Sequence, residues 1–170
     1  MKRRDFVTLS ATTLGALPVM GFSSFERFNF NMPLAKPAWV IELIKLNDKR
    51  IEPLTALQVK DASLKSFGGI LDTEEIPTPQ TTSSFISILA CAIASPESAY
   101  YKSADLLNKV AGAIQYFLKV QHSDGTIDLL STNFHSPPDT AFSVEKLAPA
   151  YSLLKASKTM LFFCLIRKAE

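Results

Sequence analysis

The sequence predicts an all-α protein of antiparallel αα-hairpins, and three observations lead to this class. Apolar residues recur at three- and four-residue spacing in several segments between positions 38 and 156. The steps Ser95-Pro96 and Ser136-Pro137 have the cap-then-proline order of a helix start. No segment shows the sustained polar–apolar alternation that indicates a strand. Helices joined by short connections pack as antiparallel hairpins, so a helical domain is expected over residues 38–156.

The first helix is expected from Ala38, and Pro53 either restarts it or kinks it before Phe67-Gly68-Gly69 ends it. Its apolar stripe consists of Trp39, Val40, Leu43, Ile44 and Leu46. A loop with an acidic cluster at Asp72, Glu74 and Glu75 follows. Such clusters usually face water, although this loop could also line a cleft.

Three further helices are expected. Residues 84–94 are apolar nearly all round, which indicates a buried helix. An amphipathic helix of about six turns is predicted from Ser95-Pro96 to near His122. The last begins at Ser136, with Pro137 at its first position, and carries an apolar stripe of Val144, Leu147, Tyr151 and Leu154.

Composition excludes some classes of function. The 170 residues carry a net charge of only +2, too weak and too evenly spread for a protein that neutralises nucleic-acid phosphates. Cys91 and Cys164 each lie in an apolar run without metal-ligand spacing, so both are expected to be small buried residues. We therefore expect no metal and no cofactor.

The N-terminus resembles a twin-arginine export signal over residues 1–22. Arg3-Arg4 precedes Phe6 and a mildly apolar run, which is too short and too polar to span a membrane. Export to the periplasm or beyond is therefore expected, with an ordinary basic N-terminus as the alternative. Residues 23–37 have no periodicity and are expected to be a linker, and the mature start is expected between Met20 and Ala38.

The polar stretch between Gln121 and Phe142 carries most of the chain's site-capable chemistry. It holds both histidines, and Ser123-Asp124-Gly125 within it has the composition of a turn. Connections on a rigid helical scaffold are where binding and catalytic groups usually lie. This stretch is therefore the candidate site.

The C-terminal residues 157–170 depart from the helical pattern. Residues 160–166 form an unbroken apolar run, Met-Leu-Phe-Phe-Cys-Leu-Ile, which is too short to span a membrane. Left exposed, this run would favour aggregation, so a covering surface is expected.

Several motifs together resemble the N-terminal part of exported α/α-toroid proteins akin to heparinase II/III-type polysaccharide lyases. The resemblance covers about residues 36–156. It is carried by Gly68-Gly69-Ile70, Pro77-Thr78-Pro79, Ser95-Pro96, Tyr100-Tyr101, Gln121–Leu129 and Asn133–Thr140. It implies an incomplete α/α toroid whose downstream half is missing, and an acidic polysaccharide as the partner.

Such lyases cleave uronic-acid polysaccharides by β-elimination, which needs a base, a group that neutralises the carboxylate and an acid. By this resemblance His135 is the candidate base or neutraliser, and Asn133 the candidate carboxylate donor. Asp124, Asp128 and Asp139 are weaker substrate-binding candidates, and turn or cap roles are the alternative for them. Because a tyrosine of the site is expected downstream, the chain alone is expected to be inactive. A non-catalytic glycan-binding or interaction module, or a fragment without function, are the other hypotheses.

Overall fold

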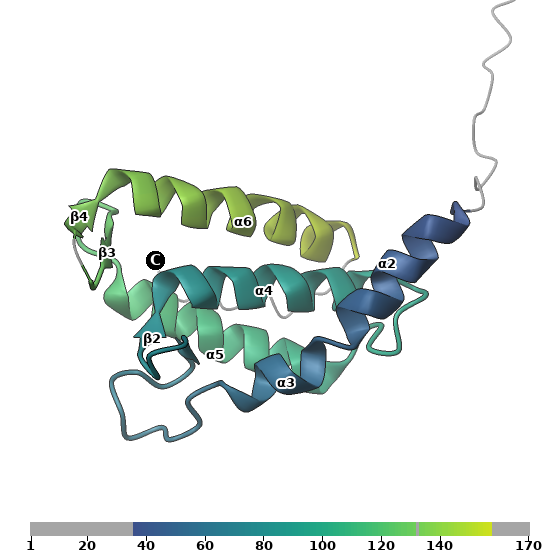
Figure 1. Cartoon of the computed structure of the whole chain (residues 1–170), viewed down its shortest axis with the longest axis horizontal. Coiled ribbons are helices and arrows are strands. Elements are labelled where there is room, and N and C mark those ends of the chain that lie inside the picture. Colours follow the sequence, from purple (N-terminus) through teal and green to yellow (C-terminus); the bar gives the residue numbers. More distant parts are fainter. Residues whose placement is uncertain (1–35, 132, 158–170) are drawn as a thin grey trace, which may run out of the picture. The chain divides into compact units, whose positions relative to one another are not determined.

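The computed structural model describes residues 36–131 and 133–157, and the elements lie within them (Figure 1). The export signal, most of the linker and the apolar tail lie outside the described residues. In chain order the elements are α2 (Ala38–Asp48), α3 (Ile51–Ala56), β1 (Ile70–Leu71), β2 (Pro77–Thr78), α4 (Pro79–Ala94), α5 (Ala104–Val120), β3 (Ile127–Leu129), β4 (Asn133–Ser136) and α6 (Pro137–Ala156).

The predicted all-α class is wrong. Strands β1 and β2 form one two-stranded antiparallel sheet, and β3 and β4 form another. Each strand is two to four residues long, which is too short for alternation to stand out from loop composition. The described residues are therefore helices joined in part by small β-hairpins.

Helix α4 is the centre of the core, as its apolar sequence predicted. Its side chains Phe85, Leu89 and Ile93 are fully buried. It begins at Pro79, earlier than expected, because the Thr78 side chain accepts a hydrogen bond from the Thr81 amide and caps the helix. Helices α5 and α6 both pack against it.

The helices do not form the predicted succession of neighbouring antiparallel pairs. Helix α6 packs chiefly against α4, although α5 lies between them in sequence. Figure 1 shows α4 and α6 side by side and running in the same direction, so the two β-hairpins that precede them lie at the same end of the helices. The predicted toroid rested on αα-hairpins stacked in sequence, so this prediction is wrong together with the all-α class.

Two helix starts were predicted from a Ser-Pro step, and one of them is confirmed. Ser136 caps α6 by accepting from the Asp139 amide, with Pro137 in the first turn. Residues after Ser95-Pro96 instead form turns, and α5 begins at Ala104 behind the Ser103 cap. Ser-Pro is equally compatible with a turn, so only a periodic segment directly behind it distinguishes the two.

The acidic cluster at residues 72–75 forms the connection between β1 and β2. The Asp72 side chain accepts hydrogen bonds from the amides of Glu74 and Ile76 at 2.9 and 3.0 Å. Glu74 and Glu75 are exposed. The two glutamates thus face water, as such clusters usually do, whereas Asp72 holds the turn and also lines a groove beside α4.

Candidate functional site

The candidate site is built on the hairpin of β3 and β4. Gly125 has a φ of 86°, which a glycine adopts without strain, and the amide of His122 donates to the Thr126 carbonyl at 2.8 Å. Ile127 of β3 is fully buried and anchors the hairpin against the helices. The predicted turn at residues 123–125 is confirmed, and it positions the side chains that follow.

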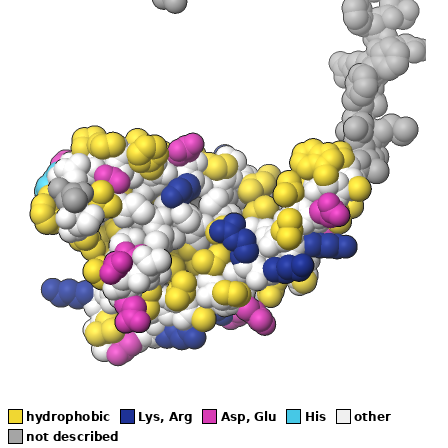
Figure 2. Space-filling model, viewed as in Figure 1, with side chains coloured by type: hydrophobic (Ala, Val, Ile, Leu, Met, Phe, Trp, Pro, Cys, Tyr) yellow, Lys and Arg dark blue, Asp and Glu magenta, His cyan; other side chains and the backbone are white. Residues whose placement is uncertain are grey.

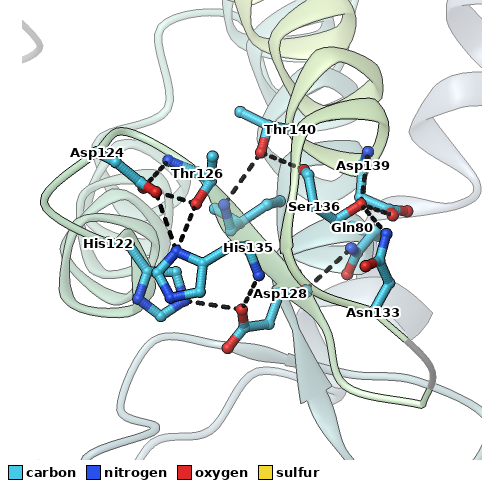
Figure 3. A network of polar contacts seen from close by, with 11 residues as sticks. Gln80, His122, Asp124, Thr126, Asp128, Asn133, His135, Ser136, Asp139 and Thr140 are labelled. Atoms are coloured by element: carbon cyan, nitrogen blue, oxygen red, sulfur yellow. Dashed lines mark hydrogen bonds and ion pairs between the residues drawn. The ribbon is translucent and has the colours of Figure 1, made fainter.

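Asp124, Thr126 and His135 form one hydrogen-bonded group (Figure 3). Asp124 Oδ1 accepts from the Thr126 amide at 2.9 Å and from its hydroxyl at 2.6 Å. Asp124 Oδ2 lies 3.0 Å from Nδ1 of His135. The carboxylate therefore fixes the orientation of the imidazole, as carboxylates do in many His-containing sites.

Asp128 joins the two histidines. Its Oδ1 accepts from the His135 amide at 2.8 Å and lies 2.7 Å from Nε2 of His122. The two imidazole rings stack with centroids 3.8 Å apart and planes inclined by 20°. His122 thus packs one face of the His135 ring, and each histidine has its own carboxylate.

Both carboxylates are held in the ionised form. Hydrogen bonds from the Thr126 side chain and amide, followed by the His135 ring, hold the pKa of Asp124 well below its ordinary value of 3.8. The pKa of Asp128 is also lowered, chiefly by the His135 amide and then by the His122 ring. A charged acceptor consequently faces each ring at neutral pH.

His135 has an unusual backbone conformation. Its φ is 49°, in the left-handed region, and the pairing of β3 with β4 is irregular between Ile127 and Leu129. A non-glycine residue in this region is strained by about 1 kcal/mol or more, and Glu75 and Lys102 adopt it as well. The side chain is about half exposed, and its Nε2 has no hydrogen-bond partner among the described residues.

Asn133 belongs to a separate group at the start of α6. Its Nδ2 donates to Oγ of Ser136 at 2.9 Å, and Ser136 Oγ donates to Asp139 in a very short hydrogen bond. Gln80 lies beside them and donates to the Asp128 carbonyl at 3.2 Å. Figure 3 shows His135 directed toward His122, and Asn133 directed toward Asp139.

The structure therefore sorts the five predicted site residues into two groups. His135, Asp124 and Asp128 come together, whereas Asn133 and Asp139 serve the N-terminus of α6. Sequence reasoning missed His122, Thr126 and Phe134 as members of the site. The signal for Thr126 was available, because an Asp-x-Thr turn places the hydroxyl on the aspartate. The stacking of His122 on His135 depends on the hairpin and had no sequence signal.

The His135 group can act as a proton acceptor or as a hydrogen-bond partner. In the described part of the chain no three His, Cys, Asp or Glu side chains are arranged to hold one. An imidazole oriented by a carboxylate through Nδ1 presents Nε2 as a proton acceptor or hydrogen-bond partner. Phe134, beside it in sequence, is 68% exposed. The arrangement suits contact with a polar ligand that also has an apolar face.

Comparisons with known proteins give no relative: no family model, curated protein or solved structure matches the chain. Among the described helices, none has both the length and the apolar character that crossing a membrane requires.

Proposed function

We propose that the chain is the N-terminal segment of an exported lyase for uronic-acid polysaccharides, with His135 as the base. The observation that supports this role is the Asp124–His135 pair, in which Nδ1 faces the carboxylate and Nε2 is free at the surface. The strained backbone of His135 also supports it. The family resemblance supplies the substrate class.

In this proposal Nε2 of His135 takes the proton α to the uronate carboxylate. The electron pair forms the new carbon–carbon double bond, and the glycosidic oxygen leaves with a proton from an acid. Within the described residues the other imidazole in contact with His135 is that of His122, whose Nε2 is already paired with Asp128 at 2.7 Å and is therefore not placed to protonate the leaving oxygen. We therefore expect this chain to bind the polysaccharide and to cleave it poorly or not at all.

A second candidate is glycan binding without catalysis, and the exposed Phe134 favours it. A ring that is 68% exposed beside charged acceptors can pack on the apolar face of a sugar while Asp and His bond its hydroxyls. The carboxylates of Asp124 and Asp128 suit hydroxyl donors better than a substrate carboxylate. This candidate needs no acid and no further segment.

The test uses the full chain with oligosaccharides of pectate, alginate and heparin, and also with neutral glucans. Chemical shifts of the His135 ring and Phe134 report binding, and ultraviolet absorbance of an unsaturated product reports elimination. The variants are His135→Asn, which tolerates a positive φ, Phe134→Ala, and Phe142→Ala as a control with a similarly exposed ring on α6.

The lyase proposal expects binding to acidic oligosaccharides that His135→Asn weakens about tenfold, because a bond to a charged group contributes about 1.5 kcal/mol or more. The control Phe142→Ala is expected to bind normally. Binding of neutral glucans that depends only on Phe134 supports the second candidate. Failure to bind any of these glycans contradicts both.

Export is part of the same proposal and rests on Arg3-Arg4, which lies outside the described residues. Replacing both arginines with lysine in a reporter fusion is expected to abolish secretion through the twin-arginine route. Unchanged secretion of the fusion contradicts the proposal.

A further inference from the structure

An open apolar groove of about 550 Å³ lies on one side of α4. Figure 2 shows this face, where hydrophobic side chains gather between basic and acidic ones. Apolar side chains dominate the lining, which comes from α3, from β1 with the turn behind it, and from α4. The lining residues include Leu54, Leu57, Phe85 and Ile88, together with Asp72 and Ser84.

We propose that residues 160–166 of this chain, the apolar run Met-Leu-Phe-Phe-Cys-Leu-Ile, occupy this groove. The run needs a covering surface, and the groove offers apolar side chains of which Leu57 is 40% exposed. Each large apolar side chain that leaves water stabilises the folded chain. When the run lies in the groove, the apolar surface of the run and that of the groove both leave water.

The length of the connection fits this placement. Lys146 of α6 donates to Oγ of Ser84, a lining residue, at 2.9 Å. From Lys146 to Ser157 the helix covers about 16 Å, at 1.5 Å per residue. A returning extended chain gains about 3.3 Å per residue, so five or six residues after Ser157 reach the level of Ser84. The phenylalanines at 162 and 163 then lie at the groove.

The basic residues after the apolar run support the same direction of the segment along α4. Arg167 and Lys168 follow directly after the apolar run. A segment that returns along α4 carries them toward the β1–β2 turn, where Asp72 lines the groove and Glu74 and Glu75 are exposed. Opposite charges at this end favour one orientation of the segment over its reverse, although each exposed pair contributes little by itself.

Disulfide cross-linking tests the placement on the full chain. Cys164 lies within the proposed segment, so a cysteine in the groove is brought close to it, whereas Cys91 is replaced by alanine to avoid a third thiol. The reporter is Leu57→Cys in the groove. Its matched control is Leu118→Cys on α5, which does not line the groove and is exposed to a similar degree, 44% against 40%.

With mild oxidation at low protein concentration, we expect an intramolecular cross-link for Leu57→Cys that forms at least about tenfold faster than for Leu118→Cys. Tethered thiols held in contact have an effective concentration in the millimolar range. Equal rates for the two variants, or no cross-link for Leu57→Cys, contradict the proposal. A covalent dimer as the main product also contradicts it, because the occupant is then the segment of a second copy.

A second experiment covers the case in which cysteine variants fold poorly. Phe162→Asp with Phe163→Asp is expected to raise the fluorescence of anilinonaphthalene sulfonate and to lower the Tm of the full chain. The matched control is Phe28→Asp with Phe30→Asp in the predicted linker, which is expected to change neither. If only Phe28→Asp with Phe30→Asp raises the fluorescence and lowers the Tm, the groove is assigned to the N-terminal segment. No change with either pair leaves the groove without an intramolecular occupant, and both results contradict the proposal.

Discussion

The two β-hairpins share one construction and differ in their chemistry. In the first, Ile70 pairs with the cap residue Thr78, and the Ile70 amide donates to Thr82 Oγ1 at 3.1 Å. In the second, Ile127 pairs with Ser136, and the Ile127 amide donates to Thr140 Oγ1 at 3.0 Å. Both threonine hydroxyls donate to the carbonyl of the cap residue at 2.7 Å.

The likeness extends to the turn before each first strand. Gly68 and Gly125 each stand two positions before the buried isoleucine, and both have a φ of 86°. Proline follows the cap residue in both hairpins, so α4 and α6 begin in the same way. The hairpin with its following helix is therefore an internal structural repeat, which the sequence alone did not reveal.

The repeat separates scaffold from site. Residues with a counterpart in the first hairpin, such as Ile127, Ser136 and Thr140, are explained by folding. Asp139 joins them, because Thr81 occupies its place and also bonds the cap hydroxyl. His135 and Asp124 have no chemical counterpart, since the first hairpin contains no histidine and therefore no carboxylate paired with one. This contrast favours a function for the second hairpin.

The largest expected effect comes from alanine at the two glycines. A Cβ on Gly68 would lie 2.0 Å from the Gly112 carbonyl oxygen, whereas a Cβ on Gly125 meets nothing nearer than Gln121 Nε2 at 3.9 Å. We expect Gly68→Ala to lower the free energy of unfolding by roughly 3–5 kcal/mol through overlap and positive φ together. Gly125→Ala is expected to cost about 1–2 kcal/mol from φ alone. Urea unfolding measures both, and equal losses would contradict the difference in packing.

The first hairpin is expected to be sensitive to alkali. Tyr116 donates to the Pro77 carbonyl at 2.6 Å, and burial raises the pKa of its hydroxyl to about 12 from 10.0. Because the folded pKa is the higher one, this stabilisation is complete below pH 10 and is lost as pH rises toward 12. The loss is roughly 2–3 kcal/mol.

Urea unfolding between about pH 9 and about pH 12 tests the alkaline prediction. This interval covers the rise in the pKa of Tyr116 from 10.0 to about 12. The variant Tyr116→Phe is expected to lack most of this pH dependence, although it loses about 1 kcal/mol at neutral pH through the missing hydrogen bond. An unchanged alkaline slope in Tyr116→Phe would assign the loss to other groups.

Substitution of the two threonines tests whether the hydrogen bonds shared by the two hairpins stabilise both of them. Thr82→Val and Thr140→Val each remove the hydroxyl that accepts from an isoleucine amide, and an unsatisfied buried amide costs about 1–3 kcal/mol. Thr82 is fully buried and Thr140 only partly, so the first substitution is expected to cost more. Thr55→Val is the control, because the hydroxyl of this partly buried threonine of α3 donates to the Glu52 carbonyl in an exposed hydrogen bond. A neutral result at both sites would show that the shared hydrogen bonds contribute little.

The smallest effect is expected at the second hairpin in acid. The lowered pKa of Asp124 means that its contribution is complete above pH 3.8, the ordinary value, and is lost as pH falls below it. Chemical shifts of the Thr126 amide and the His135 ring are expected to change together over this range. In Asp124→Asn, which has no carboxyl at position 124, this joint change is expected to disappear. Joint movement in that variant would mean that Asp128, not Asp124, couples them.

Much of the helical part of the fold was predictable from local pattern. Residues 84–94 are apolar all round and had to be buried, and Ser136-Pro137 in front of a periodic segment had to start a helix. These inferences succeeded because they depend on neighbours within one or two helical turns. The Ser95-Pro96 inference failed for the same reason, since the local pattern there suits a turn as well as a helix.

By itself the sequence determined where apolar periodicity and caps occur, and which polar stretch carries the histidines. Only the tertiary structure decided that α6 packs chiefly on α4 and that the two hairpins lie at one end of the helices. It also decided that His135 faces Asp124 and His122, whereas Asn133 turns to the start of α6. The physical reason is that a side chain's partners depend on a backbone irregularity at His135 and on the strand pairing that produces it, and neither has a period that a sequence can display.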